Sequence, residues 1–187
     1  MRIISGKLKG KKILIPKDKT TRPLKDLVKE SIFNIINHSN KFDTKIDNSI
    51  ILDLFSGVGS FGLEAISRGA NNIVFVENYI KVLPILKKNI KSLNLEDKCE
   101  IFEEDIFEDF NFKDLGKKFD IIFLDPPFKN ENKNLLITKI FKSQILHKKG
   151  IIIIHKNYKE KDNFPSSFYI LEKKKYGNSK IIFGNFT

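Results

Sequence analysis

The sequence has few residues that could crosslink the chain or hold a metal ion. Its 187 residues include one cysteine, one methionine and three histidines, and no tryptophan. Because Cys99 stands alone, no internal disulfide can form, and we expect a protein of a reducing, cytoplasmic compartment. The three histidines, His38, His147 and His155, are scattered, and no Cys or His pair has metal-ligand spacing, so no metal site is expected.

Long hydrophobic segments are absent too. No apolar run approaches the ~18–20 residues that a membrane-spanning helix needs. The opening segment MRIISGKLKGKK lacks the apolar core of a secretory signal. The length of 187 residues fits a single α/β domain. We expect residues 1–20 to be a small N-terminal β extension and residues 21–187 to be the core of that domain.

The chain carries a large positive charge. Its formal net charge is +11 and its pI is about 9.6. Such a balance favours a polyanionic partner, with nucleic acid first and an anionic membrane surface second. No basic amphipathic helix stands out, so no membrane partner is expected. Only three of the basic residues are arginines, so the codon bias of an AT-rich genome is a second explanation for the lysine surplus.

Apolar runs separated by turn residues predict the order of strands and helices. Ile3-Ile4 and 13–15 indicate the β extension, and a helix is expected from Arg22-Pro23 to Ile36, with Lys29 and Glu30 on its polar face. Further helices are expected at Ser60–Arg68, at Tyr79–Leu93 with a kink at Pro84, and at Lys133–His147. Seven strands are predicted: Ile50–Leu54, Ile73–Val76, Glu100–Glu103, Asp120–Leu124, Gly150–Ile154, Phe168–Lys174 and Lys180–Phe183.

Continuous apolar strands that alternate with helices are typical of a parallel sheet covered on both faces. The turn Tyr176-Gly-Asn-Ser179 between the last two strands predicts an antiparallel hairpin at one edge. The fold class is therefore α/β and Rossmann-like, with a mostly parallel seven-stranded sheet.

A glycine-rich turn follows the first predicted strand. The segment from Asp53 to Gly62 reads DLFSGVGSFG, and its glycines allow a tight turn and close approach of a ligand at the start of a helix. Gly57, Gly59 and Gly62 match the dinucleotide pattern G-x-G-x-x-G, which is weak evidence alone. Phe55 belongs to the same turn and is a further candidate for ligand contact.

Three acids at successive strand ends favour a different cofactor from a dinucleotide. Asp53 would repel a pyrophosphate, but it can accept hydrogen bonds from an ammonium group. Glu77 can chelate two ribose hydroxyls, and Asp105 can accept from an adenine amine. Together they describe S-adenosylmethionine, bound where this architecture places its ligands. Each acid also has a purely structural alternative: Asp53 as a cap of the turn, Glu77 as a solvated strand end and Asp105 as one acid of an acidic loop.

The segment Asp125-Pro-Pro-Phe128 comes directly after the fourth predicted strand, beside the proposed cofactor. An exocyclic base amine is a poor nucleophile until it pyramidalises and loses a proton. A carboxylate and a backbone carbonyl, held by Pro126 and Pro127, can accept both N–H bonds and impose that geometry. Phe128 can stack on the base, which is worth ~1–3 kcal/mol. The target base must leave its stack, so an unpaired base is the easier substrate.

These motifs resemble those of a known family. The Asp53–Gly59 turn with Asp-Pro-Pro-Phe is similar to class I S-adenosylmethionine-dependent methyltransferases that act on exocyclic amines. Nearly the whole chain resembles the bacterial 16S ribosomal RNA guanine-N2 methyltransferases of the RsmD type. The further matching stretches are 1–6, Arg22-Pro23, 29–34, 62–70 and 176–178. The family has threonine where this chain has Leu24. Glu64 and Arg68 match as well, but their i,i+4 spacing is explained by a helix ion pair.

The resemblance implies methylation of N2 of one guanine, nucleotide 966 in the reference numbering of 16S rRNA, on an assembling 30S subunit. By position, Asp53, Gly57 and Gly59 would hold the methionine part of the cofactor, Glu77 the ribose and Asp105 the adenine. Residues Asp125 to Phe128 would hold the guanine. Arg22 would lie near the cofactor and the RNA entrance, and the lysines expected to bind RNA are Lys7, Lys9, Lys11 and Lys12. The enzyme is expected to act as a monomer.

Three other functions were weighed. An N6-adenine DNA methyltransferase shares the Asp-Pro-Pro-aromatic chemistry, but it usually needs a target-recognition region for which this chain has little room. A non-catalytic RNA-binding assembly factor would need none of Asp53, Glu77 and Asp125. A nicotinamide oxidoreductase is disfavoured by Asp53.

Overall fold

The computed structural model describes residues 1–16, 24–108, 110–127 and 133–186. The predicted helix start at Arg22 and the aromatic Phe128 lie outside these residues. The helices are α1 (Asp26–His38), α2 (Ser60–Ser67), α3 (Leu83–Ser92) and α4 (Lys133–Ser143), with 3-10 turns η1 (Glu96–Lys98) and η2 (Phe112–Leu115). The strands are β1 (Ile50–Leu54), β2 (Asn72–Val76), β3 (Cys99–Phe102), β4 (Phe119–Leu124), β5 (Leu146–Asn157), β6 (Phe168–Tyr176) and β7 (Ser179–Phe186).

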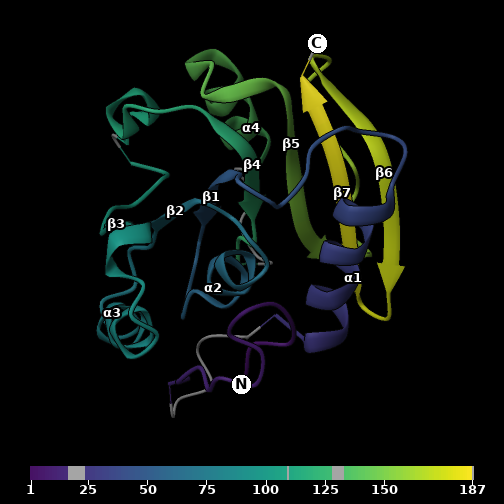
Figure 1. The fold of residues 1–187 in the computed structure, drawn as a ribbon. Helices are drawn as coiled ribbons and strands as arrows, with labels where there is room; N and C mark the ends of the chain where they lie inside the picture. The colour runs from purple at the N-terminus through teal and green to yellow at the C-terminus, as the bar shows by residue number, and fades with distance from the viewer. Residues whose placement is uncertain (17–23, 109, 128–132, 187) are drawn as a thin grey trace.

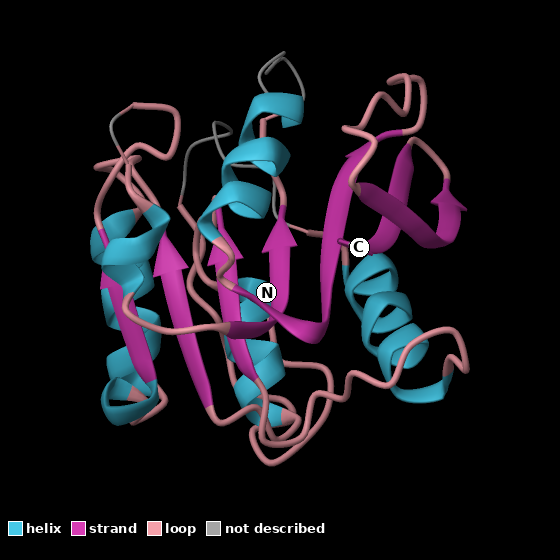
Figure 2. Ribbon diagram, turned by 90° about the horizontal axis from the view of Figure 1, so that it is seen from above, coloured by secondary structure: helices cyan, strands magenta, loops and turns pink. Residues whose placement is uncertain are grey.

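The strands form one sheet in the order β3-β2-β1-β4-β5-β7-β6. The first five are parallel, whereas β7 pairs antiparallel with both β5 and β6. The mostly parallel seven-stranded sheet with a C-terminal antiparallel hairpin is therefore confirmed. Because neighbouring parallel strands point the same way, their carboxyl ends meet at one edge (Figure 2), and loops from that edge can build a site.

Helices cover both faces of the sheet, as the continuous apolar strands indicated. Figure 1 shows α1, α2 and α3 on one side, with the N-terminal segment, and α4 on the other. Alternate residues of each central strand feed two separate cores: Ile51 and Phe123 pack toward α1–α3, whereas Leu52 and Leu124 pack toward α4. Among the described helices, none has the length and hydropathy of a membrane-spanning segment.

The N-terminal extension is simpler than predicted. It forms a single antiparallel bridge, Arg2 to Lys12, rather than two strands, although Ile3 and Ile13 also exchange backbone hydrogen bonds with Lys11 and Met1. Ile3 and Ile13 are buried against the helical face, so the apolar residues that indicated a β element do anchor this segment.

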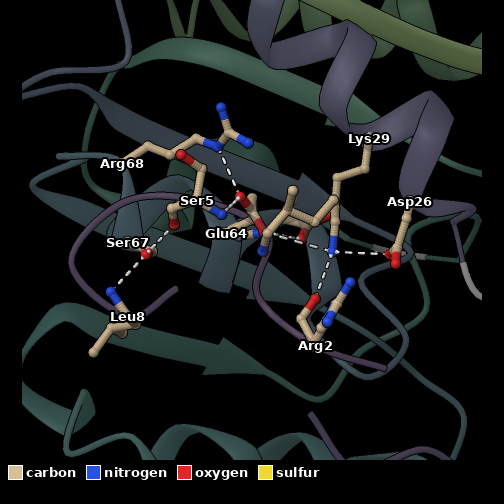
Figure 3. A network of polar contacts seen from close by, with 11 residues as sticks. Arg2, Ser5, Leu8, Asp26, Lys29, Glu64, Ser67 and Arg68 are labelled. Atoms are coloured by element: carbon tan, nitrogen blue, oxygen red, sulfur yellow. Dashed lines mark hydrogen bonds and ion pairs between the residues drawn. The ribbon is translucent and has the colours of Figure 1, made fainter. Parts of the chain in front are cut away.

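The placement of Lys29 on a polar helix face was wrong. Its side chain is fully buried, and Nζ lies 3.6 Å from Glu64 and donates to the Arg2 carbonyl oxygen at 3.3 Å (Figure 3). Burial lowers the pKa of Lys29, and the charge of Glu64 opposes that shift. The expected helix pair is present, with Arg68 Nε 2.7 Å from Glu64.

Glu64 also holds the N-terminal extension. Its carboxylate accepts backbone N–H groups from Ile4 at 2.7 Å and Ser5 at 3.0 Å. Ser67 reinforces this contact, because its hydroxyl accepts from the Leu8 N–H and donates to the Ser5 carbonyl oxygen (Figure 3). A buried carboxylate with this many donors is well compensated.

Two helix boundaries also differ from the predictions. Pro84 does not kink a helix: α3 begins at Leu83, and Pro84 lies in its first turn, where a missing N–H costs no helical hydrogen bond. Helix α4 ends at Ser143, four residues before the expected His147. Gln144 there adopts a left-handed φ of 55°, which ends the helix, and β5 then begins at Leu146 rather than Gly150.

Candidate active site

A cavity of about 590 Å³ opens at the carboxyl ends of the central strands. Its volume lies within the range that suits a cofactor or a small ligand. The predicted site residues that line it are Asp53, Phe55, Gly57, Glu77, Asp125, Pro126 and Pro127. Among the described lining residues, Gly59 and Asp105 do not appear, while Arg22 and Phe128 lie outside the described part of the chain. The sequence patterns therefore identified residues at the ends of three strands, β1, β2 and β4, that line one cavity in the structure.

The glycine turn bends sharply between β1 and α2. Phe55, Gly57 and Gly59 have positive φ angles of 61°, 55° and 81°. A Cβ on Gly57 would meet no described heavy atom within 4 Å, so this backbone is open toward the cavity. A Cβ on Gly59 would lie 2.6 Å from Leu86 Cδ1, so Gly59 permits close packing of α2 on α3. The two glycines thus serve different purposes.

Asp53 lies at the base of the cavity with only 1% of its surface exposed. One carboxylate oxygen accepts the Gly62 N–H of α2 at 3.1 Å, so the capping role and ligand contact are compatible. Burial raises the pKa of Asp53 well above its usual range, and the nearby charges of Asp125 and Glu77 raise it further, against the opposing hydrogen bond from Gly62. A cationic ligand group would favour its ionised form.

Ser56 adds a polar group to the same turn. Its Oγ is buried and has no hydrogen-bond partner among the residues that the structure describes. Ser56 also lines the cavity, so this oxygen is one that a polar ligand can satisfy. The buried Asp53, the open Gly57 backbone and the unpaired Ser56 hydroxyl together fit the zwitterionic part of S-adenosylmethionine.

Glu77 follows β2 and is buried rather than a solvated strand end. Its Oε2 accepts the Gly57 N–H at 2.7 Å, and Oε1 accepts the Asn78 and Tyr79 N–H groups at 3.0 Å and 2.9 Å. Glu77 therefore ties the glycine turn to the loop after β2. Oε1 thus uses both of its lone pairs, whereas Oε2 keeps one lone pair that can accept a hydrogen bond from a ribose hydroxyl.

Asp105 contacts the cavity only indirectly, through the side chain of a lining residue, Asn78. Its carboxylate accepts the Asn78 side-chain N–H at 2.7 Å and the Phe107 backbone N–H at 2.8 Å. Asn78 lines the cavity, so Asp105 fixes the orientation of an amide side chain in the cavity wall. Direct contact between Asp105 and an adenine amine stays a prediction.

Asp125 extends from the end of β4 into the same cavity. Its Oδ1 lies 2.6 Å from His155 Nδ1, and His155 Nε2 lies 2.9 Å from Ser179 Oγ. His155 and Ser179 line the cavity and were missed by the sequence patterns, because they reach Asp125 from β5 and β7 across the sheet. Only the position of His155 at the end of an apolar strand could have identified it.

Two of the residues that line the cavity precede α1. These are Leu24 and Lys25, and Lys25 is an exposed cation that the predictions did not include. Leu24 is 5% exposed and belongs to the core. An apolar residue can thus occupy the position where the resembling family has threonine.

The four lysines predicted to bind RNA are all exposed. Lys7 donates its backbone N–H to the Ser67 carbonyl oxygen at 2.7 Å, at the opposite end of α2 from Ser60, which lines the cavity. Lys7 is therefore remote from the cavity. Contact of Lys7, Lys9, Lys11 and Lys12 with RNA stays a prediction.

Replacing Glu77 with alanine should weaken cofactor binding and also destabilise the protein. The variant loses the expected ribose acceptor and leaves three backbone N–H groups without their acceptor. We expect a loss of affinity for S-adenosylmethionine of about 10²-fold, as for a charged hydrogen-bond partner worth ~1.5–3 kcal/mol. Isothermal titration calorimetry and thermal unfolding would measure both effects, and unchanged cofactor affinity would contradict the assignment.

Several solved structures share this fold. A proposed methyltransferase from Escherichia coli, yhhF, superposes with a TM-score of 0.81 at 24% identity, covering 100% of this chain and 97% of its own. A proposed methylase from Haemophilus influenzae, HI0767, gives a TM-score of 0.74 at 27% identity over 98% and 96% of the two chains. The fold is that of class I methyltransferases, and the cofactor is S-adenosylmethionine.

Sequence comparison narrows the class to a family. The family model described as "Conserved hypothetical protein 95" matches residues 1–185. The ribosomal RNA small subunit methyltransferase D of Buchnera aphidicola subsp. Baizongia pistaciae is 35% identical, over 94% of this chain and 86% of its own length. The protein of the same name from Haemophilus influenzae is 29% identical over 95% and 89%. The chain belongs to this family, the RsmD-type methyltransferases.

Proposed function

We propose that this protein transfers a methyl group from S-adenosylmethionine to N2 of a guanine in 16S rRNA, nucleotide 966 in the reference numbering. The observation that carries the proposal is the position of Asp125, which lines the same cavity as Asp53 and Glu77. A cofactor-binding module alone would not need a carboxylate and two prolines facing the cofactor. The name shared by the relatives supports ribosomal RNA as the substrate.

The cofactor would be held by groups around the glycine turn. Asp53 would accept from its ammonium group, Glu77 from its ribose hydroxyls, and the open backbone at Gly57 would allow its close approach. The cofactor supplies an activated methyl group. The chain's own contribution is to orient that group toward Asp125 and to exclude water from the buried base of the cavity.

The acceptor would be oriented by the segment after β4. Asp125 and the backbone carbonyl beside Pro126 would accept the two N–H groups of the guanine amine, aiming its lone pair at the methyl carbon. Methylation of a neutral amine releases one proton, and Asp125 would accept it. The flanking prolines restrict the backbone and keep this geometry rigid.

We further propose that the substrate is RNA within the assembling 30S subunit. The enzyme would act on it as a monomer in the cytoplasm. The net charge of +11 supports a polyanionic partner. Lys25, an exposed cation that lines the cavity, would contact a phosphate of the incoming nucleotide. Arg22, which precedes it in the sequence, keeps its proposed role at the RNA entrance.

Removing the N-terminal lysines should weaken RNA binding and reduce its salt dependence. Replacing Lys7, Lys9, Lys11 and Lys12 with alanine should lower the log–log salt slope by about 0.7 for each lost contact to single-stranded RNA. The matched control removes four exposed lysines elsewhere: Lys113, Lys118, Lys142 and Lys148. Fluorescence anisotropy between low and moderate salt would compare the variants. Equal effects of both sets would show that only total charge matters.

The deciding experiment is a methyl transfer assay with labelled S-adenosylmethionine. The substrates are 30S particles that lack this modification, naked 16S rRNA and duplex DNA. We expect label on guanine N2 of the particle, located by mass spectrometry of the digested RNA.

Other outcomes would overturn the proposal in different ways. Label on DNA adenine would keep the chemistry and replace the substrate. No label on any of the three, despite measured cofactor binding, would favour the RNA-binding assembly factor.

A further inference from the structure

Three cavity-lining residues form a continuous chain of contacts across the sheet. Asp125 follows β4, His155 belongs to β5 and Ser179 begins β7, three strands that are neighbours in the sheet. Asp125 Oδ1 lies 2.6 Å from His155 Nδ1, and His155 Nε2 lies 2.9 Å from Ser179 Oγ. The exposed fractions of His155 and Ser179 are 7% and 6%, so the contact between them is shielded from water, and the contact with Asp125 is partly buried.

The chemistry of the three groups sets the direction of the first hydrogen bond and, for a neutral imidazole, of the second as well. An ionised carboxylate can only accept, so the proton at the first contact must be on His155 Nδ1. In a neutral imidazole the other nitrogen is then an acceptor, and Ser179 can donate its hydroxyl proton to Nε2. The Asp125 carboxylate therefore selects the tautomer, and the Ser179 hydroxyl, which can donate or accept, provides the partner of Nε2.

We propose that His155, held by Ser179, is a positioning residue that orients the Asp125 carboxylate for methyl transfer. The inference rests on the proposed function, because it concerns the same site. His155 binds Oδ1, which leaves Oδ2 for the target amine. Without this contact the carboxylate can rotate about its χ angles, and the geometry that aligns the amine lone pair is populated less often.

A buried histidine in a strand could instead contribute only to stability. Its neighbour Lys156 provides a comparison, since it is 4% exposed and donates to the Lys161 carbonyl oxygen at 2.7 Å. Lys156 also lies 3.4 Å from Asp162 and does not appear among the described cavity-lining residues. The two positions are adjacent, buried and polar, but only His155 contacts Asp125. Lys156→Met is therefore a matched control for a purely structural loss.

The test compares His155→Leu, His155→Gln, Ser179→Ala and Lys156→Met in the methyl transfer assay, with cofactor affinity measured by calorimetry. His155→Leu should lower kcat by about 10–100-fold, the size of effect seen when a supporting hydrogen bond is lost. Its KM for the particle and its affinity for S-adenosylmethionine should stay unchanged. His155→Gln, whose amide can still donate to Asp125, should recover most of kcat, and Ser179→Ala should give a smaller loss.

The tautomer gives an independent readout in the unmodified enzyme. We expect ¹⁵N chemical shifts of His155 with Nδ1 protonated and Nε2 unprotonated, and a shift toward mixed tautomers in Asp125→Ala, which removes the acceptor of the Nδ1 proton. A wild-type kcat in His155→Leu, or equal losses in His155→Leu and Lys156→Met, would overturn the inference. Absence of methyl transfer by the wild-type protein would instead overturn the proposed function, and the positioning role with it.

Discussion

Replacing Asp125 with alanine should remove most methyl transfer while leaving the cofactor bound. The carboxylate would accept hydrogen bonds and a proton from the target amine, and general-base groups of this kind contribute about 10²–10⁴-fold. We therefore expect kcat on the particle to fall by at least about 10²-fold. Affinity for S-adenosylmethionine should change little, because Asp53 and Glu77 remain in place.

Asp120 offers a matched control on the same strand. It accepts the Ile50 backbone N–H at 2.8 Å near the other end of β4, away from the cavity. Asp120→Ala should lower stability but keep kcat. Near-normal turnover by the Asp125 variant would refute the role assigned to that carboxylate, and a loss of cofactor binding would place Asp125 in the cofactor site instead.

Replacing Asp53 with asparagine should abolish tight cofactor binding and stabilise the free protein. The amide keeps an acceptor for the Gly62 N–H but carries no charge for the cofactor's ammonium group. Burial raises the pKa of Asp53, so the folded state holds a proton that the unfolded chain releases at lower pH. Stability attributable to this group is therefore greatest below the unfolded pKa and decreases as the pH rises toward the folded pKa.

Asparagine is free of this penalty, so the variant should unfold at a higher temperature than the wild type at pH 7. Each pKa unit corresponds to about 1.4 kcal/mol, and each kcal/mol to about 2–4 °C in a chain of this size. The difference should vanish near pH 4. The wild-type affinity for the cofactor should rise with pH as Asp53 ionises. The weak affinity of Asp53→Asn should lack this pH dependence.

Calorimetric titrations and thermal unfolding between pH 5 and pH 8 would measure both trends. A lower unfolding temperature for Asp53→Asn at pH 7 would contradict the burial penalty. Asp47→Asn is a suitable control, because Asp47 is exposed and lies outside the cavity-lining residues that the structure describes.

The local patterns located all seven strands, because each central strand contains a run of apolar residues, although the polar start of β5 was missed. β1 was placed at Ile50–Leu54, as the structure has it. The carboxylates Asp53, Glu77 and Asp125 could be assigned to one edge because parallel strands share the direction of their carboxyl ends. The alternation of strands and helices was therefore sufficient to predict that these three carboxylates line the same cavity.

What the sequence could not predict depends on partners far apart in the chain. Lys29 reads as a surface lysine until Glu64, on another helix, supplies its counter-ion. His155 reads as a strand end until β4 and β7 bring Asp125 and Ser179 to its two ring nitrogens. The early end of α4 follows from the left-handed backbone of Gln144, a residue type that carries no strong stop signal.

The strand order has a consequence for the timing of assembly during synthesis. β7 follows β6 in the chain but lies between β5 and β6 in the sheet, so β6 has no described strand partner before β7 is made. Ser179, at the start of β7, also lines the cavity. At 5–20 residues per second, roughly 1–5 s separate the synthesis of His155 from that of Ser179. A nascent chain therefore acquires its glycine turn and acids early, but completes the wall beside Asp125 only when β7 joins the sheet.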